Sequence, residues 1–543
     1  MTATAVDAGD DLPLTVPALL AARAAARGDH ALLVCDGETL SYADAAARSA
    51  ALAKGLLDRG AGRGTHVGLL HPNGSGFVVG WLAAARVGAV AVPLSTFSTS
   101  AELGTLLRAA DIEHLLATTS FRGRDYAAAL REAVPGLDLA AAPPLHAASA
   151  PALRHIALDG EAPGVAGEWT AAALVDAGAA VDDDVLSAAE RGVRPADRMV
   201  IVHTSGSTSE PKGVIHQHGP LIRHLDNLNQ LRRYTDDEIL FSNSPFFWIG
   251  GFAYSLLGTL VAGATLVCSN ATDAAATLDL LERVRPTMVN GFAAAVAHLA
   301  EDPSFPGRDL SSIRRGNLWP IMPAAVRPAD PELRHNMLGM TEAGSVCLAS
   351  DDEGDQPEHR RGSFGRPVPG LEARIVDPDT GKECETGRVG ELWLRGPFLM
   401  EGYYGRERHE TFTPDGWYRT GDLFHTDADG FFYFTGRQGD MIKTAGANVS
   451  PREVEAAIAD VTGLVAHVVG VDDPGRGQVV AAALRVPAGG AAPATEELRS
   501  RLRERLSAYK VPRRFLVMAD DEVPMLSSGK LDARALKERF RDG

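Results

Sequence analysis

The sequence contains few cysteines and few lysines. Only four of its 543 residues are cysteines, at positions 35, 268, 347 and 384, and no two of them form a CxxC pair. This pattern argues against a disulfide framework and against a zinc site, and it predicts free, buried thiols in a reducing compartment. Only seven of the 53 basic residues are lysines. A lysine inside a motif is therefore more informative here than in an average sequence.

The sequence also lacks a long apolar run, a basic excess and an N-terminal signal pattern. Its apolar stretches are interrupted by glycine, arginine or aspartate before they reach the length of a membrane span. The net charge of -17 argues against general binding to nucleic acid or to an anionic membrane, because both attract basic surfaces. The first residues lack the basic and apolar regions of a signal peptide, so a cytoplasmic protein is expected.

The pattern of apolar residues predicts an α/β fold with at least two domains, since 543 residues exceed what one core organises. Strands and helices alternate in the first half, which indicates parallel sheets with helical crossovers. We expect helices at 17–26, 42–53, 76–86 and 274–284, and strands at 31–34, 38–41, 66–70, 199–202, 240–243, 264–268 and 287–290. The segment 135–197 is rich in alanine, proline and glycine and is expected to be peripheral.

The second half changes character. From residue 362 short strands broken by glycine and proline predict a small β subdomain, and from residue 436 helices and strands alternate again. We therefore expect a large N-terminal domain of parallel-rich sheets with helices, residues 1–438. A small, mobile α+β C-terminal domain is expected for residues 439–543.

The most informative stretch is TSGSTSEPKG, residues 204–213, which follows the apolar run 199–202. Glycines allow backbone N–H groups to converge on anionic oxygens, hydroxyls add donors, and Lys212 adds a positive charge. These properties suit a polyphosphate. The alternative is an ordinary surface turn, because serine, glycine and proline are common in loops. Gly213 follows Lys212, so the stretch is not a P-loop of the GxxxxGK[ST] kind.

Five further motifs decide between these alternatives. They are FFWIGG at 246–251, LGMTE at 338–342, YRTGD at 418–422, GRQGDMIKTAGANVSPREVE at 436–455 and PMLSSGKLDAR at 524–534. In this order, and together with TSGSTSEPKG, they resemble the adenylate-forming superfamily of acyl-CoA synthetases, adenylation domains and luciferases. The resemblance covers nearly the whole chain and is greatest to bacterial acyl-CoA ligases.

This resemblance implies an enzyme that uses ATP, Mg²⁺ and CoA to convert a carboxylic acid, through an acyl adenylate, into a thioester. Lys530 matches the lysine that bridges the substrate carboxylate and the α-phosphate, where its charge would stabilise the transition state. Glu342 matches the carboxylate that holds Mg²⁺, and Thr341 the hydroxyl beside the α-phosphate. The residues that match nucleotide contacts are Thr204, Ser205, Gly206, Ser207, Thr208, Lys212, Gly339, Met340, Asp422 and Arg437. Asp422 is expected to accept both ribose hydroxyls.

The resemblance also implies an acyl site and a CoA path. Amino-acid activators of the superfamily have an aspartate where this chain has Trp248, so an α-amino acid is not expected. The residues expected to form an apolar site for a bulky, lipophilic acid are Phe246, Phe247, Trp248, Gly250, Phe292 and Trp319. Some of these aromatics are alternatively plain core residues. Gly446 and Lys443 match the pantetheine path, and Gly439 matches the hinge about which the small domain rotates between the two half-reactions.

Two positions depart from the superfamily pattern near the adenine. Leu338 stands where an aromatic residue usually stacks on the base, and Trp319 stands in a stretch that usually has small residues. One alternative is therefore a ligase that adenylates weakly and mainly transfers a preformed acyl adenylate to CoA. Two others are an enzyme that loads a carrier protein and a silent nucleotide-binding or acyl-binding protein. No nucleic-acid or membrane partner is expected, and a homodimer is left open.

Overall fold

The structure is a computed structural model. It describes residues 12–160, 162–204, 211–378, 380–437, 442–486, 493–519, 522–524 and 531–542. The chain divides into two compact units. The large unit consists of Met1–Thr96, Leu107–His203 and Gly213–Thr435, and the small unit of Phe97–Leu106, Thr204–Lys212 and Gly436–Gly543. The predicted α/β fold with a large N-terminal and a smaller C-terminal part is confirmed, whereas the predicted hinge at Gly439 lies outside the described residues.

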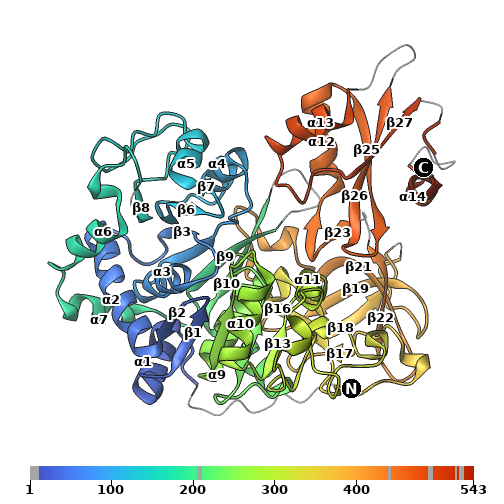
Figure 1. Cartoon of the computed structure of the whole chain (residues 1–543), viewed down its shortest axis with the longest axis horizontal. Helices are drawn as coiled ribbons and strands as arrows, with labels where there is room; N and C mark the ends of the chain where they lie inside the picture. Colours follow the sequence, from blue (N-terminus) through green and yellow to red (C-terminus); the bar gives the residue numbers. More distant parts are fainter. Residues whose placement is uncertain are drawn as a thin grey trace. The chain divides into compact units, whose positions relative to one another are not determined.

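Two predominantly parallel sheets form the main part of the large unit (Figure 1). The six-stranded sheet has the order β14 (Arg315–Gly316), β13 (Met288–Asn290), β11 (Ile239–Ser242), β12 (Thr265–Cys268), β1 (Ala31–Cys35) and β2 (Glu38–Ser41). The seven-stranded sheet has the order β20 (Gly402–Tyr403), β10 (Lys212–Gln217), β9 (Arg198–Thr204), β4 (Val90–Pro93), β3 (His66–Leu70), β5 (His114–Thr118) and β8 (His155–Asp159). In these sheets β2 and β20 pair antiparallel with their neighbours.

Helices connect the parallel strands. In the large unit they are α1 (Val16–Arg27), α2 (Tyr42–Asp58), α3 (Ser75–Arg86), α5 (Tyr126–Ala133), α6 (Ala171–Gly178), α7 (Asp183–Gly192), α8 (His218–Leu231), α9 (Gly258–Ala262), α10 (Ala274–Val284) and α11 (Ala297–Ala300). The predicted start of α2 is confirmed, because the Ser41 side chain caps the helix by accepting a hydrogen bond from the Asp44 amide. The predicted limits of α10 also agree with the structure.

The segment 135–197, predicted to be peripheral, also contributes one strand to a sheet. This segment contains β8, which pairs with β5 and extends the seven-stranded sheet at its edge. Only five residues form this strand, and their burial does not alternate, so the strand carries no period-two signal in the sequence.

Antiparallel sheets follow in the large unit. One has the order β15 (Leu338–Met340), β16 (Ser345–Ala349) and β17 (Arg366–Pro367), and the other β18 (Glu372–Val376), β19 (Gly390–Arg395), β21 (Tyr418–Thr426) and β22 (Phe432–Arg437). The predicted change to β structure is thus confirmed. It places the LGMTE and YRTGD motifs on strands or directly after them.

The small unit has its own sheet and core. Its sheet has the order β24 (Ala447–Val449), β23 (Ile442–Thr444), β26 (Gly477–Val486) and β25 (Val465–Asp473), and β27 (Arg514–Ala519) pairs with β26. Its helices are α12 (Pro451–Thr462), α13 (Thr495–Arg503) and α14 (Ala533–Asp542). Residues 97–106, which include the first part of α4 (Ser100–Ala109), also belong to this unit. Glu102 of this segment accepts hydrogen bonds from Ser507 Oγ at 2.6 Å and Lys510 Nζ at 2.8 Å.

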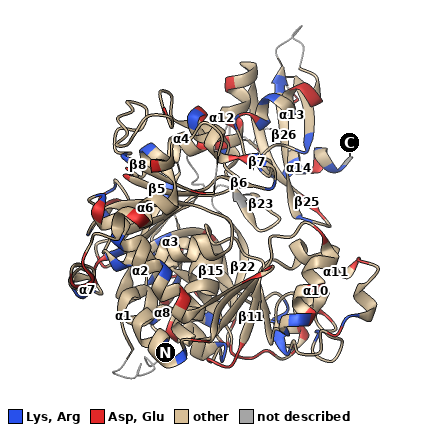
Figure 2. Cartoon of the chain, turned by 60° about the vertical axis from the view of Figure 1, so that its left-hand side comes forward, with Lys and Arg blue, Asp and Glu red and all other residues tan. Residues whose placement is uncertain are grey.

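The described residues include no helix with the length and apolar character of a membrane span. All four cysteines are free thiols, and three of them are buried. Acidic and basic side chains both occur over the molecule, and in α13 the acidic residues lie in the first turn and basic residues in the last (Figure 2).

Candidate active site

The Thr341–Glu342 motif lies on a single 3₁₀ turn (Thr341–Ala343) between β15 and β16. Gly344 ends the turn with a φ of +73°, a conformation that glycine adopts without strain. A Cβ at Gly344 would also approach Leu221 Cδ1 to 2.8 Å. Gly339 and Met340 precede the turn on β15. The sequence therefore places a hydroxyl and a carboxylate side by side at the end of a short hairpin strand.

A buried histidine forms a hydrogen bond with the backbone of this turn. His216, on β10, lies 2.7 Å through its Nε2 from the Thr341 carbonyl oxygen and is 2% exposed. Burial lowers the pKa of His216 to about 4, so the ring is neutral at physiological pH. A carbonyl oxygen can only accept, and Nε2 therefore carries the proton and donates it. His216 lies outside the sequence motifs and was not predicted as a site residue.

A second contact reaches the carboxylate itself. The Tyr403 hydroxyl, on β20, donates a hydrogen bond to Glu342 Oε1 at 2.8 Å. The same hydroxyl lies 3.2 Å from the hydroxyl of Tyr418 on β21. The Met400 amide donates to the Glu342 carbonyl at 2.9 Å. The turn is thus tied to the stretch that leads into β20 by both backbone and side chain.

A second carboxylate, that of Asp422, belongs to another strand of the large unit. Asp422 is 6% exposed on β21, and its amide donates to Thr420 Oγ1 at 3.0 Å. Burial raises the pKa of the Cys347 thiol, and the negative charges of Asp422 and Glu342 raise it further. Both carboxylates are therefore close enough to act electrostatically on one thiol. The structure brings together two of the predicted site residues from motifs that lie 80 positions apart in the sequence.

The aromatic candidates follow the ends of neighbouring parallel strands. Trp248 comes after β11, Phe292 after β13 and Trp319 after β14. The rings of Trp248 and Phe292 meet edge to face, with centroids 5.9 Å apart. In open α/β sheets, ligands bind beyond the carboxyl ends of such strands. The half-buried side chains of these three residues thus lie where the fold favours a ligand site.

Three asparagines, which the sequence analysis missed, fasten these loops. Asn243 donates to the Phe292 carbonyl at 3.0 Å and accepts from the Phe292 amide at 2.9 Å. Asn317 makes the same pair of bonds with the backbone of Gly291, at 2.9 and 3.0 Å. Asn73 donates to the Ser244 carbonyl at 3.0 Å and accepts from the Phe246 amide at 2.8 Å. A single asparagine has no sequence signal that separates such a clamp from a loop residue.

The backbone after Trp248 departs from an ordinary helix. Residues Gly250–Leu257 form a π-helix, a rare form that is frequent at functional sites. Ser255 Oγ bonds to the Gly250 carbonyl at 3.2 Å and to Ser242 Oγ at 2.8 Å. Gly250 is half-buried, and a Cβ there would meet nothing within 4 Å.

The burial of three residues bears on the predicted acyl and adenine sites. Phe246 is fully buried and packs against Phe77, with ring centroids 5.4 Å apart, so it is a core residue and not a wall of an open site. Leu338 is 5% exposed within the same core, which means that its side chain offers little surface to a base. Phe247 is 5% exposed and packs edge to face against Trp248, with ring centroids 5.5 Å apart. It therefore supports the indole as a buried neighbour.

The Asn243 clamp leads to a testable prediction. An Asn243→Ala variant is expected to raise KM for the acid about 30-fold, because it removes two hydrogen bonds that are worth about 1 kcal/mol each. KM for ATP is expected to stay within about twofold, since the clamp holds the aromatic loop. Asn227→Ala is the matched control, because Asn227 makes a single 3.5 Å bond to the Pro369 carbonyl. Equal changes of KM for acid and ATP would contradict this positioning role.

The remaining candidates belong to the small unit. Thr204 ends β9 and Lys212 begins β10, and Arg437 is the last residue of β22. Lys443 is exposed on β23, and its amide donates to Gln478 Oε1 at 3.1 Å. Gly446, with a φ of +85°, forms the tight turn between β23 and β24. The candidates outside the described residues are Ser205, Gly206, Ser207, Thr208, Gly439 and Lys530.

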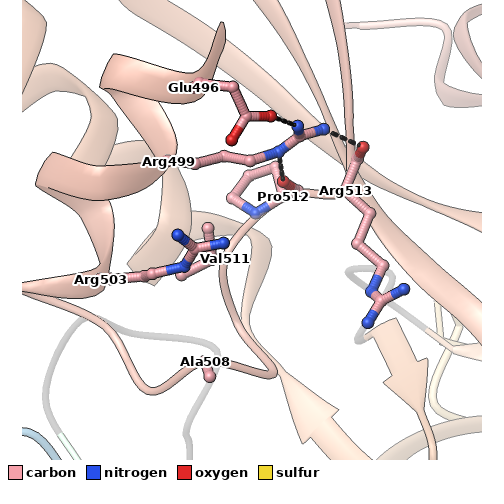
Figure 3. A pocket seen from close by; sticks show the side chains of 7 residues that line it. All are labelled: Glu496, Arg499, Arg503, Ala508, Val511, Pro512 and Arg513. Carbon is pink, nitrogen blue, oxygen red and sulfur yellow. Dashed lines mark hydrogen bonds and ion pairs between the residues drawn. The ribbon is translucent and has the colours of Figure 1, made fainter.

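The small unit also has a hollow of about 470 Å³ that the sequence analysis did not predict. Figure 3 shows its lining residues, which are Glu496, Arg499, Arg503, Ala508, Val511, Pro512 and Arg513. Arg499 is engaged there, since it pairs with Glu496 and donates to the Arg513 carbonyl at 2.6 Å. Arg503 and Arg513 are exposed and form no ion pair with the described part of the chain. The hollow therefore has a cationic rim.

Comparison with known proteins agrees with this arrangement. Residues 20–404 match the AMP-binding enzyme family and residues 453–530 the AMP-binding enzyme C-terminal domain. Feruloyl-CoA synthase of Amycolatopsis sp is 31% identical over 529 residues, which are 95% of this chain and 98% of that protein. Sulfoacetate--CoA ligase of Cupriavidus necator is 30% identical over 532 residues, covering 95% and 96%. The amide bond synthetase McbA of Marinactinospora thermotolerans has a similar structure, with a TM-score of 0.77, 26% identity and coverage of 97% and 99%.

The first family match includes the TSGSTSEPKG, FFWIGG and LGMTE motifs, and the second reaches Lys530. The predicted AMP-forming acid–thiol ligase class and the predicted use of ATP, Mg²⁺ and CoA are confirmed by the family and by the relatives' names. The chain therefore belongs to the AMP-binding enzyme family and is an acyl-CoA ligase of the adenylate-forming superfamily.

Proposed function

We propose that this ligase activates a bulky, apolar carboxylic acid without an α-amino group. The observation that carries the proposal is the edge-to-face pair of Trp248 and Phe292 beyond the carboxyl ends of β11 and β13. Aromatic side chains bury large apolar area and favour ring-shaped or aliphatic ligands. Trp248 leaves no carboxylate at the position where amino-acid activators pair with an ammonium group.

Family membership alone does not select the acid. One relative is named for an aromatic acid and another for a small sulfonated acid, so the side chains of this site must decide. The candidate wall has no basic residue that would pair with a sulfonate. Trp248, Phe292 and Trp319 instead offer half-buried apolar rings, which supports an aromatic acid over a sulfonated one.

The residues at the Thr341–Glu342 turn fit the metal and nucleotide chemistry. Mg²⁺ prefers oxygen ligands and is often held by one or two carboxylates together with substrate phosphates. Glu342 offers such an oxygen, and the described residues include no larger cluster of metal-ligating side chains. Bound Mg²⁺ would neutralise phosphate charge. Thr341 would hydrogen-bond near the α-phosphate, Asp422 would accept the ribose hydroxyls, and Lys530 would stabilise charge as the carboxylate displaces pyrophosphate.

The second half-reaction needs a site for CoA, which carries several phosphate groups. The cationic rim formed by Arg503 and Arg513 supports the small unit as the place where they bind, because guanidinium groups pair well with phosphate oxygens. Lys443 and Gly446 are proposed to line the path of the pantetheine arm.

The efficiency of the first half-reaction is the main alternative. Leu338 is buried and is not aromatic, so adenine would lack the usual stacking ring. Trp319 is bulky at a position where the superfamily usually has small residues. This observation favours, as a second candidate, a ligase that mainly transfers a preformed acyl adenylate to CoA.

One experiment tests both candidates. A panel of aromatic, alicyclic, straight-chain, sulfonated and amino acids is supplied with ATP and Mg²⁺, and pyrophosphate release is followed. Matching acyl adenylates are supplied with CoA, and thioester is followed, with a carrier protein and an amine as alternative acceptors. We expect pyrophosphate release with bulky apolar acids. A preference for amino or sulfonated acids would overturn the proposed substrate class, and thioester formation without pyrophosphate release would establish the second candidate.

A further inference from the structure

The hydrogen bond from Tyr403 to Glu342 is suited to orienting the Glu342 carboxylate. The tyrosine is 7% exposed and donates to Glu342 Oε1 at 2.8 Å. A carboxylate oxygen can only accept, so the phenol hydroxyl is the donor of this pair. A hydrogen bond to one carboxylate oxygen fixes the plane of the group and thus the direction of the other oxygen.

The donor is itself held rigidly. Tyr403 pairs with Val214 in the β20–β10 ladder, and its hydroxyl lies 3.2 Å from the Tyr418 hydroxyl. β10 also contains His216, which bonds to the Thr341 carbonyl at 2.7 Å. The turn is therefore held at its backbone by His216 and at its carboxylate by Tyr403, from two adjacent strands.

We infer that Tyr403 is a positioning residue that aims the Glu342 carboxylate at the Mg²⁺ of the adenylation half-reaction. The inference rests on the proposed function of Glu342. Groups that hydrogen-bond to a metal-ligating carboxylate set its orientation, and their loss typically lowers metal affinity or activity 10- to 100-fold. A purely structural role would instead lower thermal stability and leave the metal dependence unchanged.

The test is a Tyr403→Phe variant, which removes only the hydroxyl. Binding of Mn²⁺ in the presence of ATP, followed by electron paramagnetic resonance, is expected to weaken about 10-fold. The Mg²⁺ concentration for half-maximal pyrophosphate release is expected to rise by a similar factor, with kcat at saturating Mg²⁺ changed about threefold or less. Thioester formation from a supplied acyl adenylate is expected to stay within about twofold.

The matched control is Tyr404→Phe. Tyr404 is the next residue, and its hydroxyl donates to Asp111 at 2.7 Å. Unchanged Mn²⁺ and Mg²⁺ dependence in Tyr403→Phe, or an equal shift in Tyr404→Phe, would overturn the inference.

A double-mutant cycle separates this role from general destabilisation. In a Glu342→Gln background, adding Tyr403→Phe is expected to cause no further weakening of Mn²⁺ binding, because Tyr403 acts through Glu342. Additive losses would contradict the inference. If the wild-type protein releases no pyrophosphate with any acid, the proposed function fails, while Mn²⁺ binding with ATP still tests Tyr403.

Discussion

A Lys530→Ala variant is expected to lose ATP-dependent pyrophosphate release by roughly 100- to 1,000-fold, the usual cost of removing one charge-stabilising donor. The side chain is proposed to balance negative charge that develops on the α-phosphate and on the attacking carboxylate. Thioester formation from a supplied acyl adenylate is expected to change only a few fold, since that step begins after the phosphorus centre has reacted. The measurement is pyrophosphate release and thioester formation, scored separately.

The chain offers a matched control for this variant. Lys537, on α14, is a partly exposed lysine seven positions further along, and Lys537→Ala is expected to leave both half-reactions unchanged. Wild-type pyrophosphate release in Lys530→Ala would contradict the assignment. If the wild type released no pyrophosphate and also formed no thioester from a supplied acyl adenylate, this would revive the alternative of a silent binding protein.

The free energy of unfolding is expected to fall steeply as the pH drops from about 6.5 to about 4. Burial lowers the pKa of five histidines to about 4 and of His224 to about 3, and all six lie in the large unit. The five are His71, His114, His203, His216 and His218. Between these values and 6.5 the unfolded chain binds protons that the folded chain does not. Stability therefore rises with pH across this window and is lost as the pH falls.

The expected effect is large. A pKa lowered by about 2.5 units corresponds to roughly 3 kcal/mol for one group below both values. Six such groups sum to roughly 10 kcal/mol or more, which is comparable to the whole stability of a typical domain. Thermal unfolding of the large unit, measured between pH 7.5 and 4.5, checks this.

A single substitution makes the pH prediction specific. His224 stacks on Phe398 with ring centroids 5.3 Å apart, so His224→Phe is expected to be tolerated and to flatten the pH dependence of Tm. His409→Gln, at an exposed position, is expected to leave the pH dependence unchanged. A pH profile that is identical in wild type and His224→Phe would show that this histidine does not contribute.

Much of the fold followed from local pattern. The strand 66–70 and the helix 274–284 were predicted with the observed limits, because short apolar runs and one-sided helical periodicity carry their own signal. β8 was missed because it is stabilised by its pairing with β5, a long-range contact that cannot be predicted from five residues. The π-helix at Gly250–Leu257 was likewise invisible, since its composition is that of any buried helix.

The candidate site divides in the same way. By itself, the sequence determined the family and the chemical groups, because Glu342, Asp422, Lys212 and Trp248 occur in recognisable motifs. Only the tertiary structure decided what holds them: His216 and Tyr403 on the Thr341–Glu342 turn, and Asn243 on Phe292. It also shows that Phe246, which was expected in the wall of the acyl site, lies in the core. The physical reason is that a reactive group is selected by residue type, whereas its support is any donor that the packing of distant strands brings within 3 Å.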